Sequence, residues 1–234
     1  SRNKVFFVDE KFNISNLKKH ISKSEYSFIQ DLLKTRDNKK KILSFDFSSR
    51  SKIILVSLKK DISNTDVENL GAKFFELFKT FSQNEYTLNS DSISIKFKSL
   101  VGHFLHGLKL KSYEFDKYKT KKNKKYISLF VTGKNIPLLK DQKKLIAIEE
   151  GTFYTRDLVS EPGNVLHPDE YAKRLKSLSK YGLKVTIYDE KKLKKLGMNT
   201  LLGVGQGSIR GSYLVTMEWN GLKNNKKPVA FVGK

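Results

Sequence analysis

The chain has 234 residues, of which 38% are hydrophobic and 12% aromatic, so it can bury the core of one large domain or two small ones. It contains no cysteine, which excludes a disulfide framework, a thiolate zinc site and a cysteine nucleophile. Its net charge of +22 would attract nucleic acid or an anionic membrane, but nearly all the basic residues are Lys, whereas phosphate recognition favours Arg; we therefore favour a solvated lysine-rich surface.

The sequence shows no sign of a membrane protein. No apolar run approaches the roughly 18 residues that a membrane-spanning helix needs. The N-terminal segment SRNKVFFVDE lacks the long apolar core and the small-residue cleavage site of a signal peptide. We therefore expect a cytoplasmic protein without a membrane partner.

The first half of the chain alternates predicted strands with predicted helices. Short apolar or alternating segments predict strands at residues 5–8, 41–47, 52–58, 92–97 and 126–131. Helical spacing predicts a helix over 24–33 that Ser24 caps, and a second one that Asn64 or Thr65 caps. The second helix should bury one apolar face, made of Val67, Leu70, Phe74, Leu77, Phe78 and Phe81. This pattern predicts a mixed or parallel α/β sheet.

A third helix is predicted over residues 100–110 and carries His103 and His106. Their i, i+3 spacing places both imidazoles on one helical face, as in a metal-binding pair. No HExxH carboxylate and no third ligand accompany them in the sequence, so we assign no metal to these histidines.

The segment from Lys109 to Lys125 interleaves lysines with Tyr113, Phe115 and Tyr118. Proteins that bind single-stranded nucleic acid combine basic and aromatic side chains in this way. Acidic residues interrupt the segment, so we favour a solvated connection. A basic, non-catalytic module that binds nucleic acid weakly through Lys109–Lys125 is the alternative function.

The second half predicts another α/β domain. A long helix over 138–159 follows a boundary near residue 135, and Pro168 opens a further helix that Gly182 terminates. Next come a strand at 184–188, a short helix closed by Gly197, and strands at 213–219 and 229–232. We expect domains at residues 1–135 and 136–234.

The segment GVGQGS (203–208) is not a nucleotide-binding loop. A dinucleotide-binding motif needs the spacing G-x-G-x-x-G before a helix, and Ser208 stands at the place of its last glycine. We expect these glycines to allow positive φ angles and close packing. No Ser-His-Asp set can be assembled either, and we interpret His167 as a neighbour of a helix cap and not as a general base.

Three segments resemble the leucyl (cytosol) aminopeptidase family: TRDLVSEPGNVLHPDEYA (155–172), LGMNTLLGVGQGS (196–208) and PVAFVGK (228–234). YEFDKYKTK (113–121) extends the resemblance weakly upstream. The resemblance implies a macrodomain-like N-terminal α/β sheet, joined by a helix to the beginning of an α/β metallo-aminopeptidase catalytic domain. It also implies a homo-hexamer that releases N-terminal residues, often leucine, from peptides.

The same resemblance implies two divalent metal ions, Mn or Zn, that activate a water. Their first ligand would be Lys234, through a neutral amine, since an ammonium has no lone pair. The family's carboxylate ligands, second Lys and Arg lie further downstream. We therefore expect this 234-residue chain, taken as a fragment, to lack most of the active site and to be inactive, and we assign no catalytic residue in it. The family usually has Thr in place of His167, which predicts a weaker helix cap here.

Overall fold

The computed structural model describes residues 3–35, 40–81, 84–92, 99–121, 126–221 and 227–233. The chain forms two compact units, residues 1–157 and residues 158–234, called here the first and the second unit. The boundary predicted near residue 135 stays a prediction about where the N-terminal fold ends. Among the described residues, no helix is both long and apolar enough to cross a membrane.

The first unit is built on a five-stranded sheet with the order β2-β3-β1-β4-β5. Its strands are β1 (Asn3–Asp9), β2 (Ile42–Ser48), β3 (Ser51–Leu58), β4 (Glu85–Asn89) and β5 (Ser128–Thr132). β1 runs parallel to β3 and β4, β4 runs parallel to β5, and β2 pairs antiparallel to β3 at the edge. The expected mixed α/β sheet is therefore confirmed.

One predicted strand cannot be compared with the structure, and one observed strand was not predicted. The strand predicted at 92–97 falls almost entirely outside the described residues, which omit 93–98. β4 is not among the predicted strands, because it is short and has polar ends. Its two apolar side chains, Tyr86 and Leu88, are nevertheless fully buried.

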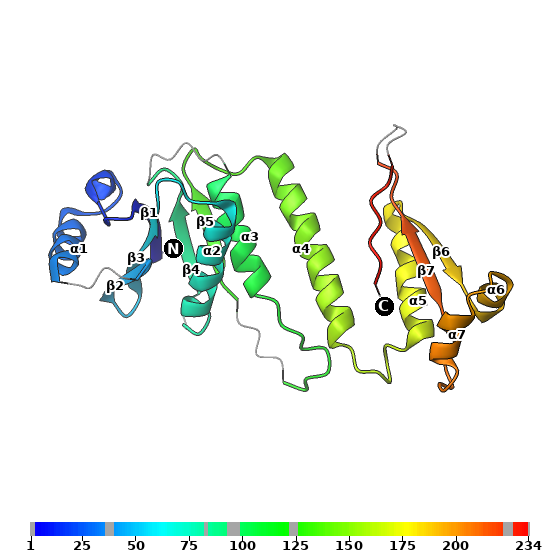
Figure 1. Cartoon of the computed structure of the whole chain (residues 1–234). Helices are drawn as coiled ribbons and strands as arrows, with labels where there is room; N and C mark the ends of the chain where they lie inside the picture. The colour runs from blue at the N-terminus through cyan, green and yellow to red at the C-terminus, as the bar shows by residue number, and fades with distance from the viewer. Residues whose placement is uncertain are drawn as a thin grey trace. The chain divides into compact units, whose positions relative to one another are not determined.

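Helices cover both faces of this sheet (Figure 1). The 3-10 helix η1 (Ser15–Lys19) and α1 (Lys23–Thr35) lie on one face, and α2 (Asn64–Phe78) and α3 (Leu100–Lys111) lie on the other. The alternation of side chains in β1 requires both layers, because Phe6 and Val8 pack toward α1 while Val5 and Phe7 pack toward α2 and α3. The result is a three-layer α/β/α unit.

The helix caps differ from the predicted ones by one or two residues. Ser22, not Ser24, caps α1: its Oγ accepts a hydrogen bond from the Glu25 amide, while the Glu25 carboxylate accepts one from the Ser22 amide. Ser63, not Asn64 or Thr65, caps α2, and its side chain accepts from the amide of Asp66. A cap needs an extended backbone just before the first helical residue, as Ser63 has with φ −78° and ψ 160°.

Helices α2 and α3 touch through their backbones at two glycines. A Cβ atom added to Gly71 would overlap the carbonyl oxygen of Phe104, and one added to Gly107 would overlap the carbonyl oxygen of Glu68. Only glycine permits so close an approach of two helices. This contact draws Phe74 and Phe104 into edge-to-face packing above the sheet.

The apolar face predicted for α2 is only partly buried. Val67, Leu70, Phe74 and Phe78 lie in the core, but Leu77 and Phe81 are 43% and 45% exposed. Both side chains lie toward the edge strand β2, where the helical layer no longer covers the sheet.

Helix α4 (Leu139–Ser160) is continuous through Gly151, as predicted. Its contacts with α3 include buried polar ones beside the apolar contact of Leu145 with Gly102. The Glu149 carboxylate lies 2.7 Å from Nδ1 of His106, and the Arg156 guanidinium donates to the carbonyl of Leu110. Ile146 and Ile148 of this helix are 48% and 45% exposed.

The second unit contains a two-stranded antiparallel sheet of β6 (Lys184–Tyr188) and β7 (Leu214–Glu218). Its helices are α5 (Pro168–Lys176), the 3-10 helix η2 (Ser177–Tyr181), α6 (Glu190–Lys195) and α7 (Asn199–Gly205). Gly182 and Gly197 terminate helices with φ angles of 91° and 71°, as their positions predict. The strand predicted at 229–232 is wrong, because described residues 227–233 have no regular structure.

The α2–α3 contact generates a stability prediction. Gly71→Ala or Gly107→Ala should lower the free energy of unfolding by about 3 kcal/mol, because the helices must separate to admit a methyl group. Gly151→Ala is the matched control: nothing lies within 4 Å of its added Cβ, and it should stabilise the protein by about 0.5–1 kcal/mol. Urea denaturation followed by far-UV circular dichroism measures all three variants, and an unchanged midpoint for both destabilising variants would contradict the close contact.

Candidate metal centre

The predicted metal ligand Lys234 lies outside the described residues. The segment that leads to it is described from Lys227 to Gly233 and is open to solvent. Val229, Phe231 and Val232 are 81%, 95% and 98% exposed. A β-strand requires a hydrogen-bonded neighbour, and no described strand pairs with these residues. The prediction that Lys234 binds metal therefore stays a prediction.

Within the described ranges, no group of three or more His, Cys, Asp or Glu side chains could hold a metal ion. His103 and His106 do lie on α3 as predicted, but each is engaged by a different helix. Nδ1 of His103 lies 2.7 Å from the Glu68 carboxylate of α2, and Nδ1 of His106 lies 2.7 Å from the Glu149 carboxylate of α4. The two imidazoles therefore connect helices.

The second unit is held by an ion-paired arginine that the sequence analysis did not single out. The Arg174 guanidinium donates to Glu161 and to Glu170, with both N···O distances 3.0 Å. The Glu161 side chain is only 2% exposed. The hydrogen bond that Arg174 donates to Glu170, followed by the one that it donates to Glu161, raises the pKa of Arg174. The same bond to Glu170 lowers the pKa of that carboxyl. The segment 155–172 thus supplies two carboxylates that fasten α5.

His167 is the cap of α5 itself and not merely a neighbour of the cap. Its Nδ1 accepts from the amide of Glu170 at 3.4 Å and also lies against the Asp169 carboxylate. Asp169 in turn lies 3.5 Å from the guanidinium of Arg210. An imidazole used in this way orders the start of a helix and is not arranged as a general base toward a substrate.

The glycines of GVGQGS lack the positive φ angles that we expected. Gly203 and Gly205 belong to α7, and neither they nor Gly207 have a positive φ angle. Close packing is confirmed for Gly205, because an added Cβ would overlap the hydroxyl of Ser212. This segment serves the packing of the second unit, and it is no phosphate-binding loop.

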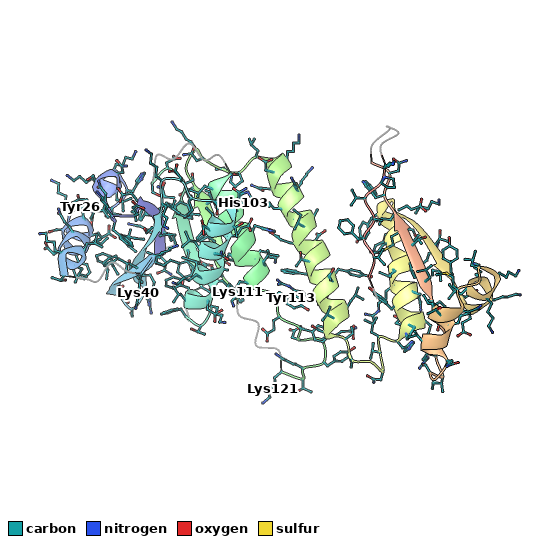
Figure 2. The ribbon with its side chains drawn as sticks, viewed as in Figure 1. Tyr26, Lys40, His103, Lys111, Tyr113 and Lys121 are labelled. Atoms are coloured by element: carbon teal, nitrogen blue, oxygen red, sulfur yellow. The ribbon has the colours of Figure 1, made fainter. Side chains whose placement is uncertain are left out.

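In the segment Lys109–Lys125, the described residues use their aromatic groups within the first unit. Tyr113 packs on Phe153 of α4 and donates to Asp157, and the Arg156 guanidinium lies over its ring (Figure 2). Lys111 pairs with Glu76, and Lys119 pairs with Glu114. Residues 122–125 lie outside the described ranges. Nucleic-acid binding by this segment stays a prediction.

Comparison with known proteins identifies relatives. The model of the cytosol aminopeptidase family, catalytic domain, matches residues 153–234. A probable cytosol aminopeptidase of Sinorhizobium fredii is 39% identical over 197 residues, which are 80% of this chain and 39% of that protein. The resemblance stated from the three motifs is therefore confirmed.

Solved structures share the fold. A mutant of tomato leucine aminopeptidase has a TM-score of 0.73 at 20% identity, covering 92% of this chain and 47% of its own. A bottromycin maturation enzyme in complex with Mn has a TM-score of 0.68 at 16% identity, and the match covers 94% of this chain and 45% of that enzyme. The α/β fold class is confirmed, and the chain spans less than half the length of these relatives.

The Arg174 contacts predict how the second unit responds to mutation. Arg174→Met should lower the free energy of unfolding of this unit by about 2–3 kcal/mol, because it removes the ion pair between Arg174 and the buried Glu161 carboxylate. Lys173→Met, at the exposed neighbouring position, should change it by less than about 0.5 kcal/mol. Fluorescence of Trp219, the only tryptophan of the chain, reports on this unit during urea denaturation. Equal midpoints for the two variants would show that the ion pairs do not stabilise it.

Proposed function

We propose that this chain, whose residues 153–234 belong to the catalytic-domain family of the cytosol aminopeptidases, is part of a metal-dependent aminopeptidase that removes N-terminal residues such as leucine from peptides. The family match carries the proposal, together with the order and spacing of the three motifs at 155–172, 196–208 and 228–234. The proposed localisation is the cytoplasm, after the names of the relatives. A homo-hexamer is proposed for the whole protein.

The proposed cofactors are two divalent metal ions, Mn or Zn, with Lys234 as one ligand. A structural neighbour solved with Mn supports a divalent ion. Such ions polarise a peptide carbonyl and lower the pKa of a bound water. The described residues do not by themselves fit such a site, since they offer no three-donor cluster. We therefore attribute to them the role of scaffold and not a catalytic step.

The scaffold role follows from contacts inside the second unit. Arg174 fastens the segment before α5 to that helix, and Gly182 and Gly197 turn the chain into β6 and away from α6. Polar caps at His167 and Asp189 fix where α5 and α6 begin. These residues hold the second unit in a defined form, and the residues that bind and activate a substrate lie elsewhere in the proposed enzyme.

The proposal predicts a division between the chain and a longer form. The 234-residue chain should release no leucine from a leucyl amide in the presence of Mn or Zn, because it supplies one proposed metal ligand. A form extended to the full length of its relatives should be active, and Lys234→Met in that form should lower kcat/KM by about 100-fold or more.

Release of p-nitroaniline from leucine-p-nitroanilide measures the activity of the 234-residue chain and of the extended form. Lys227→Met in the extended form is the control for the loss of a nearby lysine. Metal-dependent activity of the short chain would contradict the first part. An extended Lys234→Met enzyme with undiminished kcat/KM would contradict the assignment of Lys234.

A further inference from the structure

A groove of about 360 Å³ lies in the first unit between the edge strand β2 and the C-terminal end of α2. Its apolar walls include Ile42 of β2 and Leu77, Phe78 and Phe81 from the end of α2 and the turn after it. Leu77 lies at the end of α2 and Phe81 in the turn after it, and both were predicted to be buried, yet they are almost half exposed. The groove therefore leaves open apolar surface that a core would have covered.

The charges around the groove are unbalanced. Among the described residues that line it, Lys40, Lys52 and Lys73 are basic and Asp46 is the one acidic residue. Figure 2 labels Lys40 just before β2. A site with three cations and one anion, set against apolar walls, complements a ligand that carries both an apolar group and a negative charge.

Lys52 is the buried cation of the groove. The residue is 8% exposed, and its ammonium lies 3.3 Å from the Asp46 carboxylate and 4.0 Å from the centre of the Phe81 ring. An ammonium has three N–H donors, and the ion pair with Asp46 uses one of them. Asp46 itself is 66% exposed, so it compensates the buried charge only in part. The ammonium can therefore donate to a further acceptor inside the groove.

A second polar group lies on the same face of the sheet. Tyr86 of β4 is fully buried, and its hydroxyl has no hydrogen-bond partner among the described residues. Phe78, which lines the groove, packs against the Tyr86 ring. Burial first, and the Asp46 carboxylate second, raise the pKa of Tyr86 to about 12, so its phenol remains a neutral donor. The Tyr86 hydroxyl is thus an unpartnered polar group behind Phe78, on the same face of the sheet as the groove.

We propose that this groove binds a small organic anion, an alkyl or aryl group that ends in a carboxylate. The apolar body would lie against Leu77 and Phe81, and the carboxylate would accept from the ammonium of Lys52. An inorganic anion would leave the apolar walls exposed to water, and a neutral apolar molecule would leave the buried ammonium with Asp46 as its acceptor and its other N–H donors unused. This ligand site is independent of the proposed peptidase activity, since all its residues lie in the first unit.

Calorimetric titration of the 234-residue chain with 4-phenylbutyrate tests the proposal. Two isosteres serve as ligand controls, the neutral 4-phenylbutyramide and the cationic 4-phenylbutylamine. The acid should bind about tenfold more tightly than the amide, because the neutral amide carbonyl accepts from the ammonium without the attraction between opposite charges, and the amine should not bind. Equal affinities for acid and amide, or no binding of the acid, would overturn the proposal.

Protein variants locate the site. Lys52→Met keeps an apolar side chain and removes the ammonium, so it should weaken binding of the acid about tenfold and binding of the amide clearly less. Lys60→Met is the matched control, because Lys60 is exposed and does not line the groove. The Lys60→Met variant should bind the acid with the same affinity as the unmodified chain.

Circular dichroism shows whether Lys52→Met folds. If it does not fold, the variant Lys73→Met tests the proposal instead. Lys73 is exposed on α2, and Met has a similar helix propensity, so Lys73→Met should fold. It should weaken binding of the acid about two- to threefold at low salt, through the loss of a rim charge. If both the folded Lys73→Met and Lys60→Met variants bind the acid as the unmodified chain does, the groove is not the binding site.

Discussion

The backbone contact between α2 and α3 at Gly71 and Gly107 determines how the helical layer lies on the sheet of the first unit. Because the two helices touch through carbonyl oxygens, the rings of Phe74 and Phe104 are pressed together and onto Phe7 and Tyr86 of the sheet. The same crossing brings His103 within 2.7 Å of Glu68. Core packing and polar pairing in this layer both depend on two positions where no side chain is present.

At the edge of the sheet, apolar side chains near the end of α2 stay partly exposed. Drawn toward α3, α2 leaves β2 without full cover on that face, and Leu77 and Phe81 remain partly exposed. The buried ammonium of Lys52 lies at this uncovered edge, beside the Phe81 ring. The groove thus combines apolar walls with a buried charge.

Polar contacts join the elements that apolar packing leaves apart. α4 meets α3 through the buried Glu149 and His106 and through Arg156, while its own apolar residues Ile146 and Ile148 are exposed. In the second unit, Arg174 connects two carboxylates, one of them buried. Contacts of this kind depend on direction, because each requires a donor and an acceptor in register. They fix helix orientation more strictly than apolar contacts do.

The sequence by itself determined the order and type of most elements, since hydrophobic periodicity and the Gly and Pro signals act locally. The strands around 42–48 and 51–58, the helix that Pro168 opens and the αL terminators Gly182 and Gly197 all follow from such signals. The three motifs identified the family for the same reason, because a motif is a property of the sequence alone.

Only the tertiary structure decided which apolar residues are buried and which polar ones are paired. Gly71 and Gly107 look like unfavourable helix residues until α2 and α3 meet, and Leu77 looks like core until the edge of the helical layer is known. Gly203 and Gly205 read as a loop, yet they lie in a helix beside Ser212. Lys52, Glu149 and Arg174 give no signal at all, because each depends on a partner from another element. A side chain's burial depends on its neighbours in space, and those neighbours are distant in the chain.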